Sequence, residues 1–240
     1  MKFFPFVIAG VCAATWSAGA HAAIDFARDT SDPLFLTARR DFLSETHLSY
    51  SEKILRLAET FSYGITDRWS VGVNAHAQID FDGDQDGFSN VDLGAKYRLS
   101  RASDNSSRII SDVMFGLKFG GSSHVRSPEY ADSIYYAGLR FGRQWDVVTL
   151  AATVKTNWIF DNARGMAYID ATPEAYFRLI DNWRLGLGFT LRKSTRPYYD
   201  REWVNFKIVR QYGYTQYAAL VDYEFEHDEF RYGFKVNILF

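Results

Sequence analysis

Residues 230–240 read FRYGFKVNILF, and this stretch alternates between two kinds of side chain. Aromatic or branched apolar residues occupy every even position from Phe230 to Phe240, whereas Arg231 and Lys235 lie among the odd positions. Only Leu239 departs from the pattern. Successive side chains of a β-strand point to opposite faces. The stretch therefore predicts a strand with one face of hydrocarbon and one face that carries charge.

The same alternation recurs at 69–81, 91–99, 113–119 and 183–191. These segments approach the length of about ten residues that a tilted strand needs to cross a bilayer. Strands of soluble sandwiches are usually shorter, about five or six residues. No segment of the chain beyond its N-terminal region approaches the roughly eighteen apolar residues of a spanning helix. The pattern predicts an all-β protein, an antiparallel transmembrane β-barrel whose apolar faces are covered by lipid.

We predict twelve strands, and an even number returns both ends of the barrel to the periplasm. Losing the first strand and the one at 202–209, which have the weakest patterns, would leave ten. The predicted strands span 41–50, 54–63, 69–81, 89–99, 109–119, 131–142, 147–160, 167–179, 183–193, 202–209, 213–225 and 229–240.

The connections between these strands differ in length from one side of the barrel to the other. GITDR, RQWD and IDN are short, whereas DGDQDG, GGSSHVRSPEY and STRPYYDRE are long or polar. Short periplasmic turns and longer external loops are typical of outer-membrane barrels. Trp69, Trp145 and Trp183 lie at short turns, and Trp158 and Trp203 fall near the opposite strand ends. We therefore expect two interfacial tryptophan girdles.

The N-terminal residues have the pattern of a secretory signal peptide over 1–22. Lys2 precedes an apolar run, and Ala20-His21-Ala22 provides a cleavage site near Ala22. We expect residues 23–40 to form a periplasmic lead-in and residues 41–240 to form a barrel in the cell outer membrane. The single cysteine, Cys12, lies within the signal, so the exported protein would contain no disulfide.

The polar faces of the strands carry many charges. Lys96, Arg98, Arg140, Arg178 and Arg184 fall near short turns and would surround the periplasmic mouth, where rings of basic residues favour anions. An open alternative is that luminal acids pair with these residues and the side chains simply fill a narrow barrel. The candidate lumen and selectivity residues are Lys96, Arg98, Lys118, Arg140, Arg178, Arg184, Arg192, Arg231, Lys235, Asp92, Asp112, Glu174 and Asp222.

Two resemblances add to this interpretation. The first is the C-terminal pattern of Tyr232, Phe234, Val236, Ile238 and Phe240, which resembles the assembly signal of bacterial outer-membrane barrels and implies insertion by the barrel-assembly machinery. The second covers about forty residues and is similar to the phenol-degradation (MetA-pathway) type of outer-membrane barrel, which implies a role in moving hydrophobic compounds. Its matching residues are Tyr63, Gly64, Thr66, Asp67, Arg68, Asp92, Gly94, Lys96 and Tyr97.

These observations predict an outer-membrane channel or passive transporter for small solutes. One alternative is a porin for acidic oligosaccharides, similar to the small oligogalacturonate-specific porins, and another is a non-conducting structural barrel. No sequence pattern calls for a cofactor. The mature chain would carry 26 Lys and Arg against 29 Asp and Glu, which argues against a nucleic-acid partner. The expected partners are outer-membrane lipid, the assembly machinery and an unknown small solute.

One strand carries residue types that are found in barrel enzymes. Glu45, His47 and Ser49 share one strand face, as in the lipid-A deacylase type of barrel enzyme. Neighbours two apart on a strand are about 6 to 7 Å apart at the backbone, which is far for a nucleophile and its base. We therefore predict no enzyme, with a lipid-modifying barrel as a remote alternative.

One acidic loop resembles a metal site in its spacing, and one other residue, Glu59, conflicts with the alternation. Asp82, Asp84 and Asp86 are spaced as in a calcium loop, but Leu93 stands where such a loop needs a bidentate glutamate. We therefore predict no metal site. The misfit is Glu59, which alternation places towards lipid; a bulge, a local shift of register or a side chain reaching for the interface would each account for it.

Overall fold

The computed structural model describes residues 28–100, 109–121, 124–125, 127–160, 165–179 and 182–240. The predicted signal peptide at 1–22 lies outside these residues. The described chain contains no helix that is long and apolar enough to cross a membrane.

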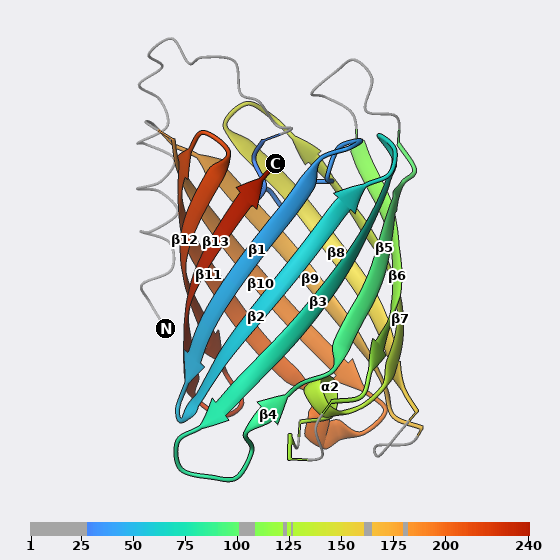
Figure 1. Cartoon of the computed structure of the whole chain (residues 1–240), viewed down its shortest axis with the longest axis vertical. Coiled ribbons are helices and arrows are strands. Elements are labelled where there is room, and N and C mark those ends of the chain that lie inside the picture. Colours follow the sequence, from blue (N-terminus) through green and yellow to red (C-terminus); the bar gives the residue numbers. More distant parts are fainter. Residues whose placement is uncertain (1–27, 101–108, 122–123, 126, 161–164, 180–181) are drawn as a thin grey trace.

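Twelve antiparallel strands form a closed barrel, as the sequence predicted (Figure 1). Pairing of the first strand with the last, and of the second with the third, completes the ring. A two-residue strand, β4, pairs with β3 outside the ring. The strands are β1 (Phe42–Ser51), β2 (Ile54–Gly64), β3 (Trp69–Asp80), β4 (Gly87–Phe88), β5 (Val91–Arg98), β6 (Ile109–Phe119), β7 (Ile134–Gln144), β8 (Val148–Ile159), β9 (Ala167–Arg178), β10 (Trp183–Ser194), β11 (Arg201–Tyr212), β12 (Thr215–Glu224) and β13 (Glu229–Leu239).

Both strands with weak sequence patterns are present. β1 pairs with β13 over nine residue pairs, from Leu43 with Leu239 to Ser51 with Arg231. β11 extends beyond the predicted 202–209 and has twelve residues. The ten-strand alternative is therefore wrong.

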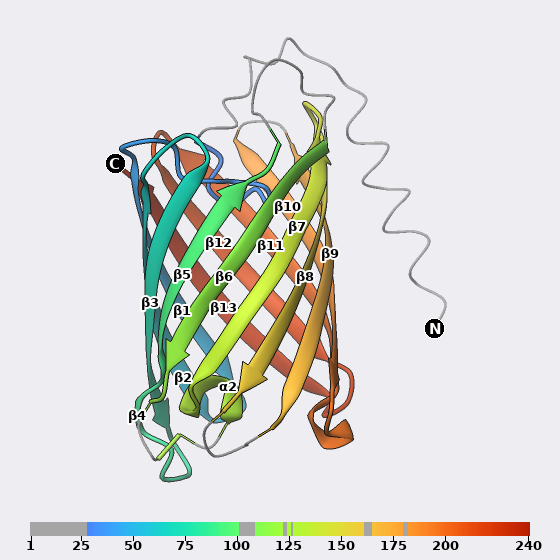
Figure 2. The ribbon, with the colours of Figure 1, turned by 90° about the vertical axis from the view of Figure 1, so that its right-hand side faces the viewer.

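The two ends of the barrel differ (Figures 1 and 2). We call the end where β1 begins and β13 ends the terminal end, and the opposite end the loop end. The short helix α2 (Pro128–Ala131), the turn η1 (Pro197–Tyr199) and β4 all lie at the loop end. The strands cross between the two ends at a marked tilt, as closure of a barrel requires.

The outer face of the barrel carries the exposed apolar side chains. Tyr135 and Trp158 stack there with ring centroids 5.5 Å apart, and Phe234 is 48 % exposed. Glu59 lies on this outer face, opposite Thr46 and Ala75, and the pairing of β2 with both neighbours is continuous around it. A bulge is therefore ruled out, and Glu59 is a carboxylate on the apolar face.

The girdle prediction is wrong for one tryptophan, Trp203. Trp203 pairs with Thr190 and Glu224 on the inner face, and the guanidinium carbon of Arg192 lies 5.0 Å from its ring centroid. Trp158 is 42 % exposed on the outer face, as expected. The residues of β11 that face the lumen have odd numbers, so the alternation of this strand places Trp203 on the inner face.

A row of glycines thins the inner wall across three strands. Gly72 pairs with Gly94, and Gly94 pairs with Gly116. The Tyr136 side chain lies over Gly94 and Gly116, and its hydroxyl donates to Asp92 Oδ1 at 3.0 Å. A Cβ atom on Gly116 would lie 2.4 Å from the Tyr136 hydroxyl and 2.5 Å from the Leu93 carbonyl oxygen. The wall at this point accepts only glycine.

We expect Gly116→Ala to lower the free energy of unfolding by about 1 to 3 kcal/mol, because the added methyl group forces backbone to move. Urea unfolding of the refolded barrel, followed by tryptophan fluorescence, measures this change. Gly188→Ala is the matched control, since its Cβ would meet no atom closer than 3.4 Å. Equal unfolding midpoints for the two variants would contradict the close contact at Gly116.

Candidate functional site

Residues 28–37, which we call the plug segment, lie at the terminal end of the barrel, and all of them except Arg28 and Pro33 are buried (Figure 1). Asp29, Asp32 and Leu34 are almost fully buried. The segment turns tightly, with Asp32 Oδ1 accepting from the Leu34 backbone N–H at 2.7 Å. The lead-in prediction over 23–40 had not placed these residues in the lumen. Their position blocks part of the terminal mouth.

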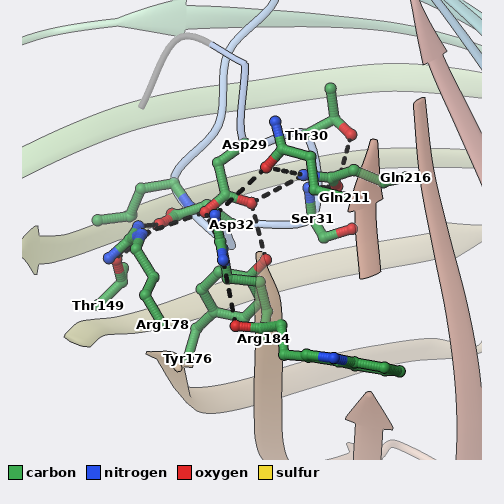
Figure 3. Close-up of polar contacts among 12 residues, drawn as sticks. Asp29, Thr30, Ser31, Asp32, Thr149, Tyr176, Arg178, Arg184, Gln211 and Gln216 are labelled. Carbon is green, nitrogen blue, oxygen red and sulfur yellow. Dashed lines mark hydrogen bonds and ion pairs between the residues drawn. The ribbon is translucent and has the colours of Figure 1, made fainter. Parts of the chain in front are cut away.

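Arg178 on β9 is the main anchor of the plug segment (Figure 3). Its Nε lies 3.1 Å from Asp29 Oδ2, and its Nη2 contacts Asp32 Oδ2. Thr149 on β8 also donates to Asp32 Oδ2, at 2.6 Å. All four side chains are buried. Charge-assisted hydrogen bonds of this kind are about twice as strong as neutral ones.

The carboxylate of Asp29 has three further neighbours. The Tyr176 hydroxyl donates to its Oδ1 at 2.7 Å, and Gln216 Nε2 donates to the same atom at 3.0 Å. Arg184 Nε lies 3.5 Å from Oδ2, an ion contact rather than a hydrogen bond. The Gln216 side-chain oxygen accepts from the Thr30 hydroxyl at 2.8 Å, which fixes the orientation of the amide.

Basic residues of the wall also hold the backbone of the plug segment. Arg140 donates to the carbonyl oxygens of Pro33 at 2.8 Å and Phe35 at 3.0 Å. Arg98 donates to the Leu34 carbonyl oxygen at 2.6 Å. Lys207 Nζ donates in the same way to the Ser31 carbonyl oxygen, at 3.0 Å.

Asp112 balances the two arginines that contact the plug backbone. Its Oδ1 accepts from Arg98 Nε at 2.9 Å, and its Oδ2 accepts from Arg140 Nε at 2.8 Å. The Asp112 side chain is fully buried. A single carboxylate therefore connects two strands to the plug segment.

Glycines make room for the chain that leads into β1. A Cβ on Gly64 would lie 1.7 Å from the Ala38 carbonyl oxygen, and a Cβ on Gly142 would lie 3.0 Å from Leu34 Cδ1. Both positions are closed to a side chain, since a Cβ on Gly142 would also lie 2.3 Å from the Leu150 carbonyl oxygen of the neighbouring strand.

Two cavities lie between the plug segment and the middle of the barrel. One of about 260 Å³ is lined by the plug segment together with Lys96, Lys207 and Lys235. The other, of about 370 Å³, is lined by Lys96 and Lys155 together with polar groups such as Asn74. Lys235 pairs with Glu45, and both side chains line the first cavity. Lys96 is exposed to both spaces.

At the loop end, α2 carries Glu129 into the lumen. Its Oε2 lies 3.0 Å from Arg192 Nη1, and Arg192 Nε lies 2.7 Å from Asp170 Oδ1. Burial raises the pKa of Glu129, but the charges of Arg192 and Lys118 outweigh it and hold this pKa well below its usual range. A further cavity of about 280 Å³ is lined by Glu129 and Arg192.

The structure places the predicted lumen residues at three levels of the inner face. Their role in selectivity stays a prediction. Those in contact with the plug segment, directly or through Asp112, are Arg98, Asp112, Arg140, Arg178 and Arg184; those of the middle are Asp92, Lys96, Glu174 and Lys235; those of the loop end are Lys118, Arg192, Asp222 and Arg231.

Sequence reasoning missed the acidic residues that enter the lumen at its two ends. Asp29 and Asp32 lie in a segment without strand periodicity, and Glu129 lies in a long connection. The acid-rich stretch DTSDP, directly before a barrel with basic residues at its short turns, was the available signal. For Tyr176 and Gln216, the sequence contained no signal beyond their position on an inner face.

The other candidates occupy ordinary places. Glu45 pairs with Lys235, which leaves its carboxylate committed to an ion pair rather than to His47. Asp82 forms an exposed ion pair with Lys53 at 2.6 Å. The predicted assembly residues Tyr232, Phe234, Val236 and Ile238 follow the outer face of β13, and Phe240 pairs with Phe42 beyond it; their role in assembly stays a prediction.

A carboxylate and imidazole cluster of Glu224, Glu226 and His227 also lies at the loop end among the described residues. Arg201 pairs with both glutamates, so these carboxylates already have a cation.

No family model and no curated protein matches the sequence. The fold is similar to that of two solved porins. One is described as "KdgM porin in complex with disordered oligogalacturonate", with 12 % identity, a TM-score of 0.64, and coverage of 82 % of this chain and 98 % of that one. The other, a NanC porin, has 10 % identity, a TM-score of 0.64, and coverage of 81 % and 98 %. The chain therefore has a small porin-like barrel fold, whereas the phenol-degradation resemblance is not confirmed.

We expect Asp112→Asn to lower the free energy of unfolding by about 3 kcal/mol, because it leaves two buried guanidinium groups without their shared counter-charge. Urea titration of the refolded protein provides the measurement. Asp82→Asn, at the exposed pair with Lys53, should leave the midpoint unchanged. If both variants behave alike, Asp112 is not the electrostatic link between Arg98 and Arg140.

Proposed function

We propose that this protein is an outer-membrane channel for small solutes and that it prefers anions. The apolar outer face would meet membrane lipid after insertion by the barrel-assembly machinery. Solutes would diffuse through the lumen without a chemical step, so the proposed activity is transport rather than catalysis. The porin-like fold is consistent with this activity, and the argument rests on the inner face.

One observation carries the proposal. No ion pair joins Lys96, Lys118 or Lys155 to a carboxylate within the described parts of the chain, although all three are on inner-face positions of β5, β6 and β8. The Lys155 ammonium instead lies 5.3 Å from the Tyr136 ring centroid. Cationic side chains along a narrow pore raise the local concentration of anions and favour their passage.

These lysines form part of a path between the two ends. Lys118 is next to the last residue of β6 at the loop end, and Lys96 lines both interior cavities. Lys207 and Lys235 continue the path beside the plug segment. An anion could therefore move from one ammonium group to the next, with binding at each site weak enough to permit release.

Two other functions of the barrel agree less well with the structure of the lumen. A filled structural barrel conflicts with the cavities of about 370 and 260 Å³. A route for apolar compounds conflicts with the ammonium and carboxylate groups that line these cavities. An acidic oligosaccharide remains a candidate solute class, because its carboxylates suit the same lysines; the solved KdgM structure contains such a molecule.

We expect reversal potentials in a planar bilayer, measured under a potassium chloride gradient, to show an anion preference for the mature protein. Lys96→Gln combined with Lys155→Gln should lower the ratio of anion to cation permeability severalfold, because two cationic side chains leave the pore.

Lys53→Gln is the matched control, since it removes a lysine at an exposed loop-end pair. Cation preference in the unmodified protein, or an unchanged permeability ratio in the double variant, would overturn the proposal. Inserted barrels that never conduct would also overturn it.

A further inference from the structure

We infer that Thr149, Tyr176, Arg178, Arg184 and Gln216 form a binding site for a small dicarboxylate, here called the carboxylate site, and that Asp29 and Asp32 of the plug segment occupy it as an internal ligand. Its link to solute passage rests on the proposed function, whereas the binding site itself does not. A solute with two carboxylates would compete with the plug segment for the same donors.

The donors belong to the barrel and not to the plug segment. Thr149 lies on β8, Tyr176 and Arg178 on β9, Arg184 on β10 and Gln216 on β12. Strands of a closed sheet hold side chains more rigidly than loops do, so the site keeps its shape when its occupant changes. Figure 3 shows the five side chains converging on the two aspartates.

The arrangement distinguishes two carboxylate positions. One accepts from Arg178 Nε, Tyr176 and Gln216, at 2.7 to 3.1 Å, and is filled by Asp29. The other accepts from Thr149 and from Arg178 Nη2, and is filled by Asp32. One guanidinium thus contacts both positions, a geometry that suits two carboxylates close together in one molecule.

Charge balance explains why an anion is needed for the plug segment to leave. Arg178 pairs with the carboxylates of both Asp29 and Asp32. The Arg178 side chain is 2 % exposed. Removing two carboxylates from a buried cation is costly, so departure of the plug segment alone is strongly unfavourable. Exchange for a dissolved dicarboxylate keeps the same number of opposite charges.

The plug segment also has the properties of a displaceable ligand. Its other contacts with Arg98, Arg140 and Lys207 run through neutral backbone carbonyl oxygens, which bind cations less strongly than carboxylates do. The chain continues directly into β1, so a displaced segment remains attached and can return. Attachment gives it a high effective concentration, which favours dicarboxylates over monocarboxylates as competitors.

The test uses the mature protein and its Asp29→Asn, Asp32→Asn double variant, with succinate and acetate as probes. The double variant removes both internal carboxylates and leaves every donor of the carboxylate site. We expect its open fraction in a planar bilayer to rise by about tenfold or more, the factor for losing one charge-assisted hydrogen bond.

Binding is measured separately from conductance. Succinate well above its dissociation constant should raise the thermal unfolding midpoint of the double variant by about 3 °C or more. Acetate should have a smaller effect, and the unmodified protein, whose site is filled, should respond less to either probe. Adding Arg178→Gln to the double variant should abolish the response to succinate. Asp82→Asn serves as the control for loss of an acidic residue away from the site.

A second variant keeps the site intact in case the first does not fold. Asn237 Nδ2 donates to the Thr30 hydroxyl at 3.0 Å, so Thr30→Cys and Asn237→Cys can be joined by a short thiol-reactive cross-linker. Cross-linking should abolish the rise in conductance that succinate causes, and cleavage of the cross-linker should restore that rise.

The outcomes separate this inference from the proposed function. A double variant with an unchanged open fraction and no response to succinate overturns the inference, even if the channel prefers anions. A rise in conductance with succinate that persists when the plug segment is cross-linked overturns it as well. Stabilisation by succinate in a barrel that never conducts supports the carboxylate site and contradicts the proposed channel function.

Discussion

Closure of the sheet is the constraint on which the rest of this structure depends. A strand edge inside a bilayer would leave backbone N–H and C=O groups without partners, so the strands must form a ring. The pairing of β1 with β13 completes that ring over nine residue pairs. Once it is closed, period-two alternation has only one meaning: one set of side chains meets lipid and the other is trapped in the lumen. Strand number, tilt and the identity of the inner residues all follow from this division.

Trapped inner residues create the second problem, which is electrostatic. The inner face carries arginines that are buried at the terminal end, and buried charges are stable only with partners. Asp112 supplies one partner from the wall for Arg98 and Arg140. For Arg178, the plug segment supplies Asp29 and Asp32 from outside the strand pattern. The plug segment is therefore as much a part of the charge balance of the barrel as the strands are.

The sequence predicted what depends on local alternation and missed what depends on distant contacts. β13 could be located from eleven residues, and all twelve strands were found, because lipid imposes the same period on each. The plug segment has no period, and its partners lie far along the chain; the Tyr176 contact with Asp29 spans 147 positions. Trp203 was misplaced because a tryptophan near a strand end suits an interface as well as an inner wall, and only the register of β11 separates the two. Glu59 was recognised as a misfit, and the structure shows that the register is continuous around it.

A plug segment that is held in a channel by ion pairs differs in its energetics from a plug that is held by apolar contacts. An apolar plug would leave only by exposing apolar surface, at a cost that is nearly independent of which solute is present. An ionic plug leaves arginines behind, and the cost of that step depends on whether an anion can replace it. The same guanidinium groups that hold the plug segment would then sense the solute. Because Arg178 contacts both aspartates, the replacement must present its charges in a matched pair, and specificity follows from the spacing of the donors on β8, β9 and β12 rather than from the width of the pore.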